Sequence, residues 1–319
     1  MTTRPGVRRL RIVAPAKVNL GLRITGLRPD GSHELESLFA PLDFGDEVVI
    51  ETAPAPGRSV DLALEVQTPL AAAVPAGRAN LAARAAERFL DRAGLACAVR
   101  IHLTKRIPAA AGLGGGSSDA GAVLRALVEC FPDALAPPAL AELALGLGAD
   151  VPFFLDPRPA IVRGIGERVE PLTGLPALAL LLVNPGIPLA TAEVYRAFDA
   201  LGTDPSGRSS TAVPVRLEPL LRAGGAGPPR RGPWDRAFAR ALEDLLENDL
   251  EAAAVRLCPP VARLRARLRK AGARAVGLSG SGPTVLGVFD SPAAAAAGSA
   301  REGFEPPVWA RVATTLESR

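Results

Sequence analysis

The chain has 319 residues, of which 48% are hydrophobic and 22% are charged, with a formal net charge of +4. This length is about twice the ~150 residues typical of one domain, so we expect two globular units. The apolar content excludes a disordered or collagen-like chain. The basic residues form no compact block, which disfavours a nucleic-acid partner. No segment reaches the ~18 apolar residues of a membrane span.

The N-terminus and the cysteines indicate a cytoplasmic protein. Residues 1–16 carry charges but lack the apolar segment of a secretory signal. The three cysteines, Cys97, Cys130 and Cys258, are far apart and lack metal-ligand spacing, as expected of reduced thiols. Among the 37 basic residues only Lys17, Lys105 and Lys270 are lysines. Lys17 and Lys105 lie in motif-like stretches, which suggests that a compact positive charge is needed at these two positions.

The first third of the chain predicts strands over residues 8–16, 18–26, 46–51 and 59–66, where aliphatic residues alternate with polar ones. We expect these strands to pair in antiparallel fashion. Apolar spacing then predicts a helix over 80–92 and a strand over 97–103. A glycine-rich loop follows, and leads into a helix over 116–130.

The second half of the chain has a different pattern. A strand over 160–163 precedes a turn at Gly164 and Gly166, and the apolar stretch 177–183 predicts a buried strand. We therefore place the domains at 1–166 and 167–319. The turn-forming stretch 202–233 predicts a mobile surface connection. Helices over 234–271, a strand, a Gly-Ser loop, a strand, an Ala-rich helix and a strand over 308–314 complete an α+β pattern.

The densest chemical signal is the stretch KRIPAAAGLGGGSSDAG, from Lys105 to Gly121, between a predicted strand and a predicted helix. Its glycines permit close backbone approach to a ligand, and the helix that follows presents free N–H groups and the positive end of its dipole. The hydroxyls of Ser117 and Ser118 can bind phosphate or Mg²⁺. Asp119 in the first helical turn is either a cap or part of this site. We interpret the loop as a phosphate-binding site.

Other phosphate motifs do not fit the chain. It contains no G-x-x-x-x-G-K-[ST], and Ser117 replaces the last glycine of a G-x-G-x-x-G. Asp43, Phe44 and Gly45 spell the DFG triplet of protein kinases, but no HRD is present and the triplet precedes the glycine-rich loop. A turn between two strands is the better interpretation.

Three stretches resemble the superfamily of galactokinase, homoserine kinase, mevalonate kinase and phosphomevalonate kinase (GHMP kinases). They are Pro108 with AAAGLGGGSS, PAKVNLGLRITG over 15–26, and GLSGSGPTVLGVF over 277–289. Further stretches, in the same order, are similar to the branch that acts on 4-diphosphocytidyl-2-C-methyl-D-erythritol: RPDGSHELESLFAPLDFGDEV, GADVPFF, GIGERVEPL and NDLEAAA. The resemblance spans nearly the whole chain.

The resemblance implies a fold and a reaction. The fold is α+β, with an N-terminal ribosomal-protein-S5-like domain that binds ATP, a C-terminal ferredoxin-like domain that binds substrate, and the active site between them. The reaction is direct, ATP- and Mg²⁺-dependent phosphorylation of the 2-hydroxyl of the cytidyl substrate, in the non-mevalonate route to isoprenoid precursors. Its partners are this small molecule and ATP, with no nucleic acid or membrane, and the enzyme is a monomer or homodimer.

The resemblance also assigns roles by position. Lys17 and Asp150 match the catalytic pair, in which the aspartate is the general base, while Asn19, His33 and Tyr195 match substrate-binding residues. Positions that match the ATP site are Asn80, Lys105, Pro108, Gly112, Leu113, Gly114, Gly115, Gly116, Ser117 and Ser118. Gly280, Ser281 and Gly282 match the family's C-terminal loop, which closes around the reacting centre. The metal ligands are not assigned.

Two residues depart from the branch pattern. Ser32 stands where a tyrosine is common, which removes an aromatic partner from one face of the cytosine. Ala110 stands where glycine is common, so either the loop is reshaped or the position has an ordinary φ.

Without the resemblance, other interpretations of the same residues are favoured. Asp150 is then a turn residue, Lys17 a solvated strand end, and Tyr195 a helical core residue. Rival functions are a homoserine or mevalonate kinase and, from another class, a non-catalytic RNA-binding module.

Overall fold

The computed structural model describes residues 6–68, 74–202, 213 and 236–317. Most of the predicted surface connection at 202–233 therefore lies outside the described residues. The chain forms two compact units with interleaved segments. The first unit comprises Met1–Ala16, Phe44–Ala109 and Gly114–Pro157, and the second comprises Lys17–Asp43, Ala110–Leu113 and Arg158–Arg319. The assignment of continuous domains at 1–166 and 167–319 stays a prediction.

The sheet of the first unit is mixed. It contains the N-terminal part of β1 (Arg8–Leu27), the C-terminal part of β2 (His33–Pro54), β3 (Ser59–Val66) and β4 (Cys97–Lys105). The expectation of antiparallel pairing concerned the four strands predicted over residues 8–66 and did not include β4. The pair β2–β4 is antiparallel, whereas β3 pairs with β4 in parallel, so the expectation was wrong for β3. The reason is that the connection from β3 to β4 contains a helix, α1 (Leu81–Ala93), whose length permits a crossover.

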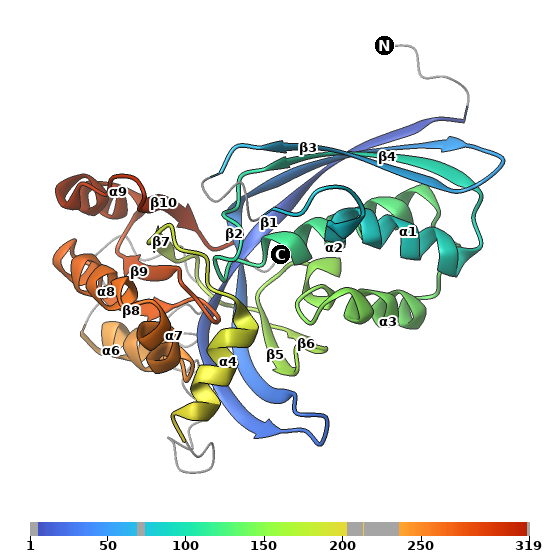
Figure 1. Ribbon diagram of the computed structural model, residues 1–319. Coiled ribbons are helices and arrows are strands. Elements are labelled where there is room, and N and C mark those ends of the chain that lie inside the picture. The colour runs from blue at the N-terminus through green and yellow to red at the C-terminus, as the bar shows by residue number, and fades with distance from the viewer. Residues whose placement is uncertain (1–5, 69–73, 203–212, 214–235, 318–319) are drawn as a thin grey trace. The chain divides into compact units, whose positions relative to one another are not determined.

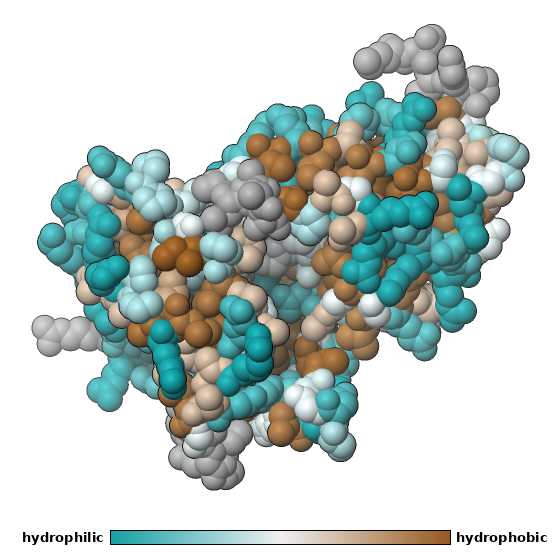
Figure 2. Space-filling model, viewed as in Figure 1, coloured by the Kyte–Doolittle hydropathy of each residue, from teal (hydrophilic) through white to brown (hydrophobic). Residues whose placement is uncertain are grey.

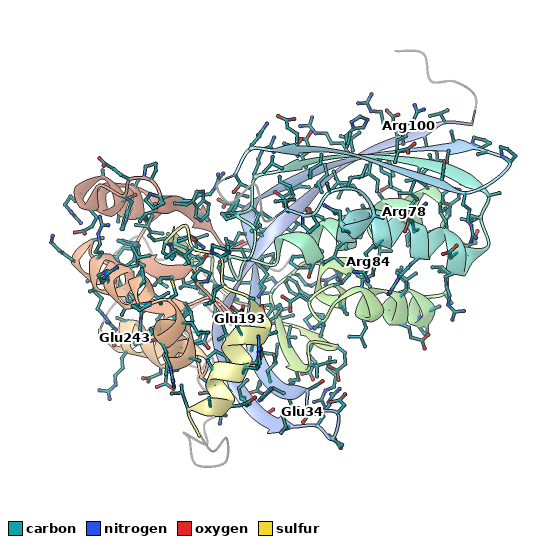
Figure 3. All side chains as sticks on the ribbon, viewed as in Figure 1. Glu34, Arg78, Arg84, Arg100, Glu193 and Glu243 are labelled. Atoms are coloured by element: carbon teal, nitrogen blue, oxygen red, sulfur yellow. The ribbon has the colours of Figure 1, made fainter. Side chains whose placement is uncertain are left out.

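Helices cover one face of this sheet (Figure 1): α1, α2 (Gly115–Cys130) and α3 (Pro137–Leu147). Helices α1 and α2 match the predicted helices over 80–92 and 116–130, whereas α3 was not predicted. Alanine-rich faces of α1 and α2 and alternate residues of β4 form one buried core. Two short 3-10 helices flank these elements, η2 (Gly77–Ala79) and η3 (Pro152–Leu155). Arg78 on η2 is exposed and Arg84 on α1 is half-buried (Figure 3). The surface over this part of the first unit is largely hydrophilic (Figure 2).

Two local predictions about β1 and β2 were wrong. The strands expected over 8–16 and 18–26 are one continuous strand, β1. Asp43, Phe44 and Gly45 lie inside β2 rather than in a turn. The glycine is explained by packing, because a Cβ built on Gly45 would overlap with the backbone of Ala14 on β1. Only glycine permits the two backbones to approach so closely.

The second unit is built on an antiparallel sheet in the order β10-β7-β9-β8. Its strands are β7 (Ala179–Asn184), β8 (Ala275–Leu278), β9 (Val285–Phe289) and β10 (Trp309–Thr314). The helices α8 (Pro260–Lys270) and α9 (Pro292–Glu302) pack on this sheet. The strand, loop, strand, helix and strand predicted at the C-terminal end are confirmed.

Other elements complete the second unit. The helices are α4 (Thr191–Ala200), α6 (Arg236–Leu245) and α7 (Glu251–Leu257). A separate ladder joins the N-terminal part of β2 to β5 (Ala160–Gly164), and β5 to β6 (Arg168–Pro171). Together the two units confirm the predicted α+β fold. Within the described ranges, no helix has the length and apolar character needed to span a membrane.

Candidate active site

The phosphate loop ends in the first unit at a helix N-terminus. Gly114 caps α2 in the left-handed conformation, with φ of 71°, and no side chain caps the helix. The free N–H groups of the first turn and the helix dipole therefore favour an anion. Ser117 is half-buried on this turn, whereas the hydroxyl of Ser118 is fully buried and donates to the carbonyl of Pro15 at 2.7 Å. Of the two serines, Ser117 is the better placed for phosphate.

A buried cluster of three charged side chains lies next to the phosphate loop. Lys105, at the end of β4, donates to Asp46 on β2 and to Asp119 on α2, the latter at 2.6 Å. Asp46 also accepts from the backbone of Arg106 and Ile107. Asp119 is thus an ion-pair partner, and its interpretation as a helix cap was wrong. Asp46 was not among the predicted site residues, although it lies in one of the stretches that carry the family resemblance.

The two carboxylates of this cluster compete for one ammonium. Burial alone would lower the pKa of Lys105, but Asp119 and Asp46 outweigh this effect and raise it. Burial raises the pKa of Asp119 well above its usual range, since Lys105 opposes this only in part and the charge of Asp46 adds to it. The second carboxylate oxygen of Asp119, Oδ1, is buried and has no hydrogen-bond partner among the described residues.

Asn80 is the cap of α1. Its side chain accepts from the N–H of Ala82 at 2.9 Å and donates to the carbonyl of Pro75 at 2.9 Å, and it is only 4% exposed. These bonds account for an asparagine at this position by helix capping. Its predicted contact with the nucleotide stays a prediction.

Asp150 precedes η3 and is half-buried. Close packing sets its position in the first unit, because a Cβ on Gly121 of α2 would overlap with Phe154 of η3. A Cβ on Gly148 would likewise lie 3.9 Å from the hydroxyl oxygen of Ser117. The segment that carries Asp150 is therefore packed beside the N-terminal half of α2.

In the second unit, Lys17 and Asn19 lie side by side on β1. The ammonium of Lys17 donates to the side-chain oxygen of Asn19 at 2.5 Å and lies 4.3 Å from the ring centroid of Phe39. Lys17 is 3% exposed, so its alternative interpretation as a solvated strand end, made without the family resemblance, was wrong. The amide of Asn19 donates in turn to Ser37 on β2. Ser37 and Phe39 were missed, although strand alternation over 35–39 marks them as neighbours on one face.

The C-terminal Gly-Ser loop packs on the same group. The hydroxyl of Ser279 donates to the carbonyl of Gly112 at 2.9 Å and accepts from the backbone N–H of Asn19 at 3.2 Å. A Cβ on Gly112, where φ is 75°, would overlap with the backbone of Ser279. Asn248 fastens the loop by donating to the carbonyls of Leu278 and Gly280. The structure thus brings together predicted residues from three distant stretches: Lys17, Asn19, Gly112, Leu113, Gly280, Ser281 and Gly282.

The predicted base-binding residues also meet in this unit. The ring centroids of His33 and Tyr195 are 4.9 Å apart, with planes tilted by 34°. Nε2 of His33 lies 2.7 Å from a carboxylate oxygen of Asp199, one helical turn after Tyr195 on α4. A carboxylate only accepts, so Nε2 carries the proton. Asp199 was missed, because its contact with His33 joins residues 166 positions apart.

Ala110 settles one question that the sequence left open. Its φ is 49°, in the left-handed region, and no other non-glycine residue of the described ranges has a positive φ. The alternative of an ordinary φ at this position was therefore wrong, and Ala110 adopts a conformation for which glycine is favoured.

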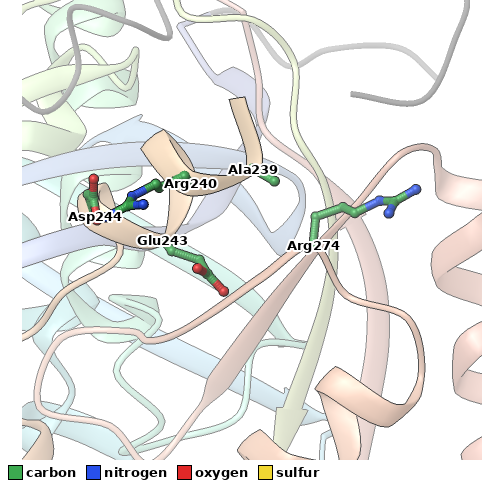
Figure 4. A pocket seen from close by; sticks show the side chains of 5 residues that line it. All are labelled: Ala239, Arg240, Glu243, Asp244 and Arg274. Atoms are coloured by element: carbon green, nitrogen blue, oxygen red, sulfur yellow. The ribbon is translucent and has the colours of Figure 1, made fainter. Parts of the chain in front are cut away.

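A pocket of about 390 Å³ in the second unit contains none of these residues. It is lined by Ala239, Arg240, Glu243, Asp244 and Arg274 (Figure 4). The guanidinium of Arg274 points away from α6 and binds Asp290 at 2.6 Å. The wall of this pocket carries side chains of both charges.

Comparisons with known proteins identify the family of the chain. Residues 80–156 match the model "GHMP kinases N terminal domain" and residues 235–304 match "GHMP kinases C terminal". The chain is 38% identical to the 4-diphosphocytidyl-2-C-methyl-D-erythritol kinase of Citrifermentans bemidjiense over 91% of this chain and 92% of that one. It belongs to the 4-diphosphocytidyl-2-C-methyl-D-erythritol kinase family.

Further relatives support membership of this kinase family. The Thermus thermophilus protein of the same name is 42% identical, with 88% of each chain covered. A crystal structure of a 4-(cytidine 5'-diphospho)-2C-methyl-D-erythritol kinase superposes with a TM-score of 0.71 at 39% identity, covering 96% of this chain and 100% of that one. Homoserine kinase from Cytophaga hutchinsonii, at 18% identity and a TM-score of 0.67, shares the fold, with coverage of 99% of this chain and 96% of that one. The chain is an ATP-dependent small-molecule kinase.

Proposed function

We propose that this kinase transfers the γ-phosphoryl group of ATP to the 2-hydroxyl of 4-diphosphocytidyl-2-C-methyl-D-erythritol, in the non-mevalonate route to isoprenoid precursors. Support comes from family membership over nearly the whole chain. In this proposal the protein acts in the cytoplasm, as a monomer or a homodimer.

The observation that carries the substrate assignment is the contact of His33 with Tyr195. These two residues lie 162 positions apart, and the fold of the second unit places them in one aromatic cluster with Phe198. An aromatic face and an imidazole edge suit a nucleobase, which offers a π-face for stacking and polar groups on its edge. Homoserine and mevalonate have no base, so their recognition would need neither residue.

In the proposed mechanism, Asp150 accepts the proton of the attacking hydroxyl and Lys17 compensates the charge that develops on the transferred phosphoryl group. In phosphoryl transfer the protein mainly positions the reactants and stabilises charge electrostatically. Residues whose side chains are held in place by packing are suited to both tasks. The N–H groups at the start of α2 would bind the ATP phosphates. Contacts of Asn80, Lys105 and Pro108 with the nucleotide belong to the same proposal.

We propose that Mg²⁺ enters with ATP. When bound, it would supply positive charge beside the phosphate oxygens, and such sites usually need only one or two protein ligands beside water and phosphate. The described residues contain no group of three metal-binding side chains, so the ligands would come mainly from ATP. The half-buried Ser117 on the first turn of α2 is the protein group best suited to contribute an oxygen.

A substrate panel tests the proposal. ADP release is measured with the cytidyl substrate, homoserine and mevalonate at equal concentrations. We expect turnover with the cytidyl substrate alone, and a higher kcat/KM for homoserine or mevalonate would refute the assignment.

Two variants test the catalytic pair. Asp150→Asn should abolish turnover while ATP affinity stays close to that of the wild type, because the amide keeps the shape but cannot accept the proton. Lys17→Met should act similarly by removing charge stabilisation. A kcat close to the wild-type value in either variant would show that the residue is not catalytic.

A further inference from the structure

A chain of buried hydrogen bonds in the second unit has a single consistent direction. It begins at the carbonyl of Gly21, which can only accept a hydrogen bond, and Ser37 lies 2.6 Å from it. Ser37 must therefore donate its only proton to Gly21. Its oxygen is left as an acceptor, so the atom of Asn19 that lies 2.9 Å away must be the amide nitrogen.

The direction of this chain sets the orientation of the Asn19 side chain. With its nitrogen bound to Ser37, its oxygen faces the ammonium of Lys17 at 2.5 Å. The opposite orientation would place two donors, the amide and the ammonium, against each other. It would also leave the oxygen of Asn19 facing an oxygen of Ser37 that has no proton to give. All three side chains are at least 97% buried, so such errors would not be repaired by bulk water.

We propose that Ser37 is a positioning residue for the phosphoryl transfer: it orients the amide of Asn19, and through it holds the ammonium of Lys17 at the position where charge develops. This inference rests on the proposed catalytic role of Lys17. The long side chain of lysine needs such support, because its ammonium is a flexible point charge.

The surroundings of Lys17 explain why Ser37 matters. The ring of Phe39 covers the ammonium from one side at 4.3 Å, but a ring face attracts a cation without fixing its direction. A Cβ on Gly280 would lie 3.0 Å from the oxygen of Asn19 and 3.7 Å from the ammonium, so the Gly-Ser loop is also close. The directional contact that this chain of bonds fixes is the one from Asn19.

The test compares four proteins: wild type, Ser37→Ala, Ser37→Thr and the control Thr315→Val. The control removes another buried hydroxyl of the same unit, which accepts from the backbone of Leu178. We expect Ser37→Ala to lower kcat by roughly ten- to a hundredfold, with KM for both substrates within about threefold, because positioning is felt mainly in the transition state. Ser37→Thr keeps the hydroxyl and should restore at least half of kcat. Thr315→Val should lower the melting temperature by about as much as Ser37→Ala does, while its kcat stays at the wild-type value.

Ser37→Ala in a Lys17→Met background distinguishes a failure of the proposal about Ser37 from a failure of the proposed catalytic role of Lys17. If Ser37 acts through Lys17, Ser37→Ala should change the residual single-turnover rate of Lys17→Met by less than about twofold. The proposal is overturned if Ser37→Ala keeps kcat within twofold of the wild type while Lys17→Met is severely impaired. It is also overturned if Ser37→Ala lowers the rate equally in both backgrounds. A wild-type kcat in Lys17→Met would instead refute the catalytic role of Lys17, and the inference about Ser37 with it.

Discussion

Replacement of Lys105 by methionine should destabilise the protein strongly, because it leaves the carboxylates of Asp46 and Asp119 buried without their cation. The side chains of Lys105, Asp46 and Asp119 are 4%, 0% and 2% exposed. Removing one partner of a buried ion pair typically costs about 3–5 kcal/mol. We expect Lys105→Met to fall in the upper half of this range, since one cation serves two carboxylates.

The two carboxylates should respond differently to replacement by asparagine. Asp46 accepts from Lys105 and from two backbone N–H groups, which an amide cannot reproduce. Within the described part of the chain, Asp119 accepts only from Lys105 and its Oδ1 has no partner, so Asp119→Asn should cost less than about 1 kcal/mol at pH 7. The double variant Lys105→Met/Asp119→Asn should be about 1–3 kcal/mol more stable than the sum of the two single changes predicts.

The pH dependence provides a second measurement on the same variants. Because the pKa of Asp119 is raised on folding, the folded protein binds this proton more tightly than the unfolded chain. The wild type therefore loses stability relative to Asp119→Asn as pH rises above the unfolded pKa of about 4. The loss is at most about 1.4 kcal/mol per pH unit, until the folded pKa is reached. Below pH 4 the carboxyl is protonated in both the folded and the unfolded states, so this loss of stability is absent.

The assay is urea denaturation followed by circular dichroism, with Asp46→Asn as the matched comparison for Asp119→Asn. A cost below about 1 kcal/mol for Lys105→Met would refute the reasoning, because the carboxylates would then be adequately solvated without the ammonium. An Asp119→Asn variant as unstable as Asp46→Asn would also contradict it.

Three further predictions concern other parts of the chain. Ala110→Gly should raise stability by about 0.5 kcal/mol in urea denaturation, because relief of left-handed strain of ~1–2 kcal/mol exceeds the entropic cost of glycine; a loss would contradict the strain. Gly121→Ala should cost about 1–3 kcal/mol and lower kcat by displacing Phe154 and η3, whereas an unchanged kcat would uncouple η3 from catalysis. Tyr195→Ala should raise substrate KM roughly ten- to a hundredfold, and Asp199→Ala about tenfold, in ADP-release kinetics; an unchanged KM would exclude a role in base binding.

Regular elements of this fold were predictable where one face of an element is apolar. The periodicities of α1, α2 and the C-terminal strand-loop-strand-helix-strand pattern identified these elements within a few residues. The sequence did not reveal the parallel pairing of β3 with β4, because this pairing depends on which edge of the sheet receives the crossover. The helix α3 was missed because its apolar residues are spread around the helix, and only Ala144 and Leu147 are buried.

Some residues of the candidate site were likewise predictable from the sequence, and others were not. Glycines and charges in the family-like stretches marked Lys17, Asn19 and the loop around Gly112 as candidates, and the second unit brings these together. The partners Ser37, Ser279 and Asp199 could not be derived from spacing, because each is defined by a contact between segments far apart in the chain. Predicting such partners requires strand register and helix rotation, which a single sequence does not specify.

The interleaving of the two units has a consequence for biosynthesis. Residues 17–43 leave the ribosome early but pack in a unit whose sheet begins with β7 and is completed only by β10. At about 5–20 residues per second, the ribosome needs roughly 6–25 seconds to travel from the end of β2 to the start of β7. During that time Leu22 and Ile24, at most 3% exposed in the finished protein, lack their partners. The nascent chain therefore presents an apolar segment well before it can be buried, which makes this stretch a natural substrate for chaperones that act during translation.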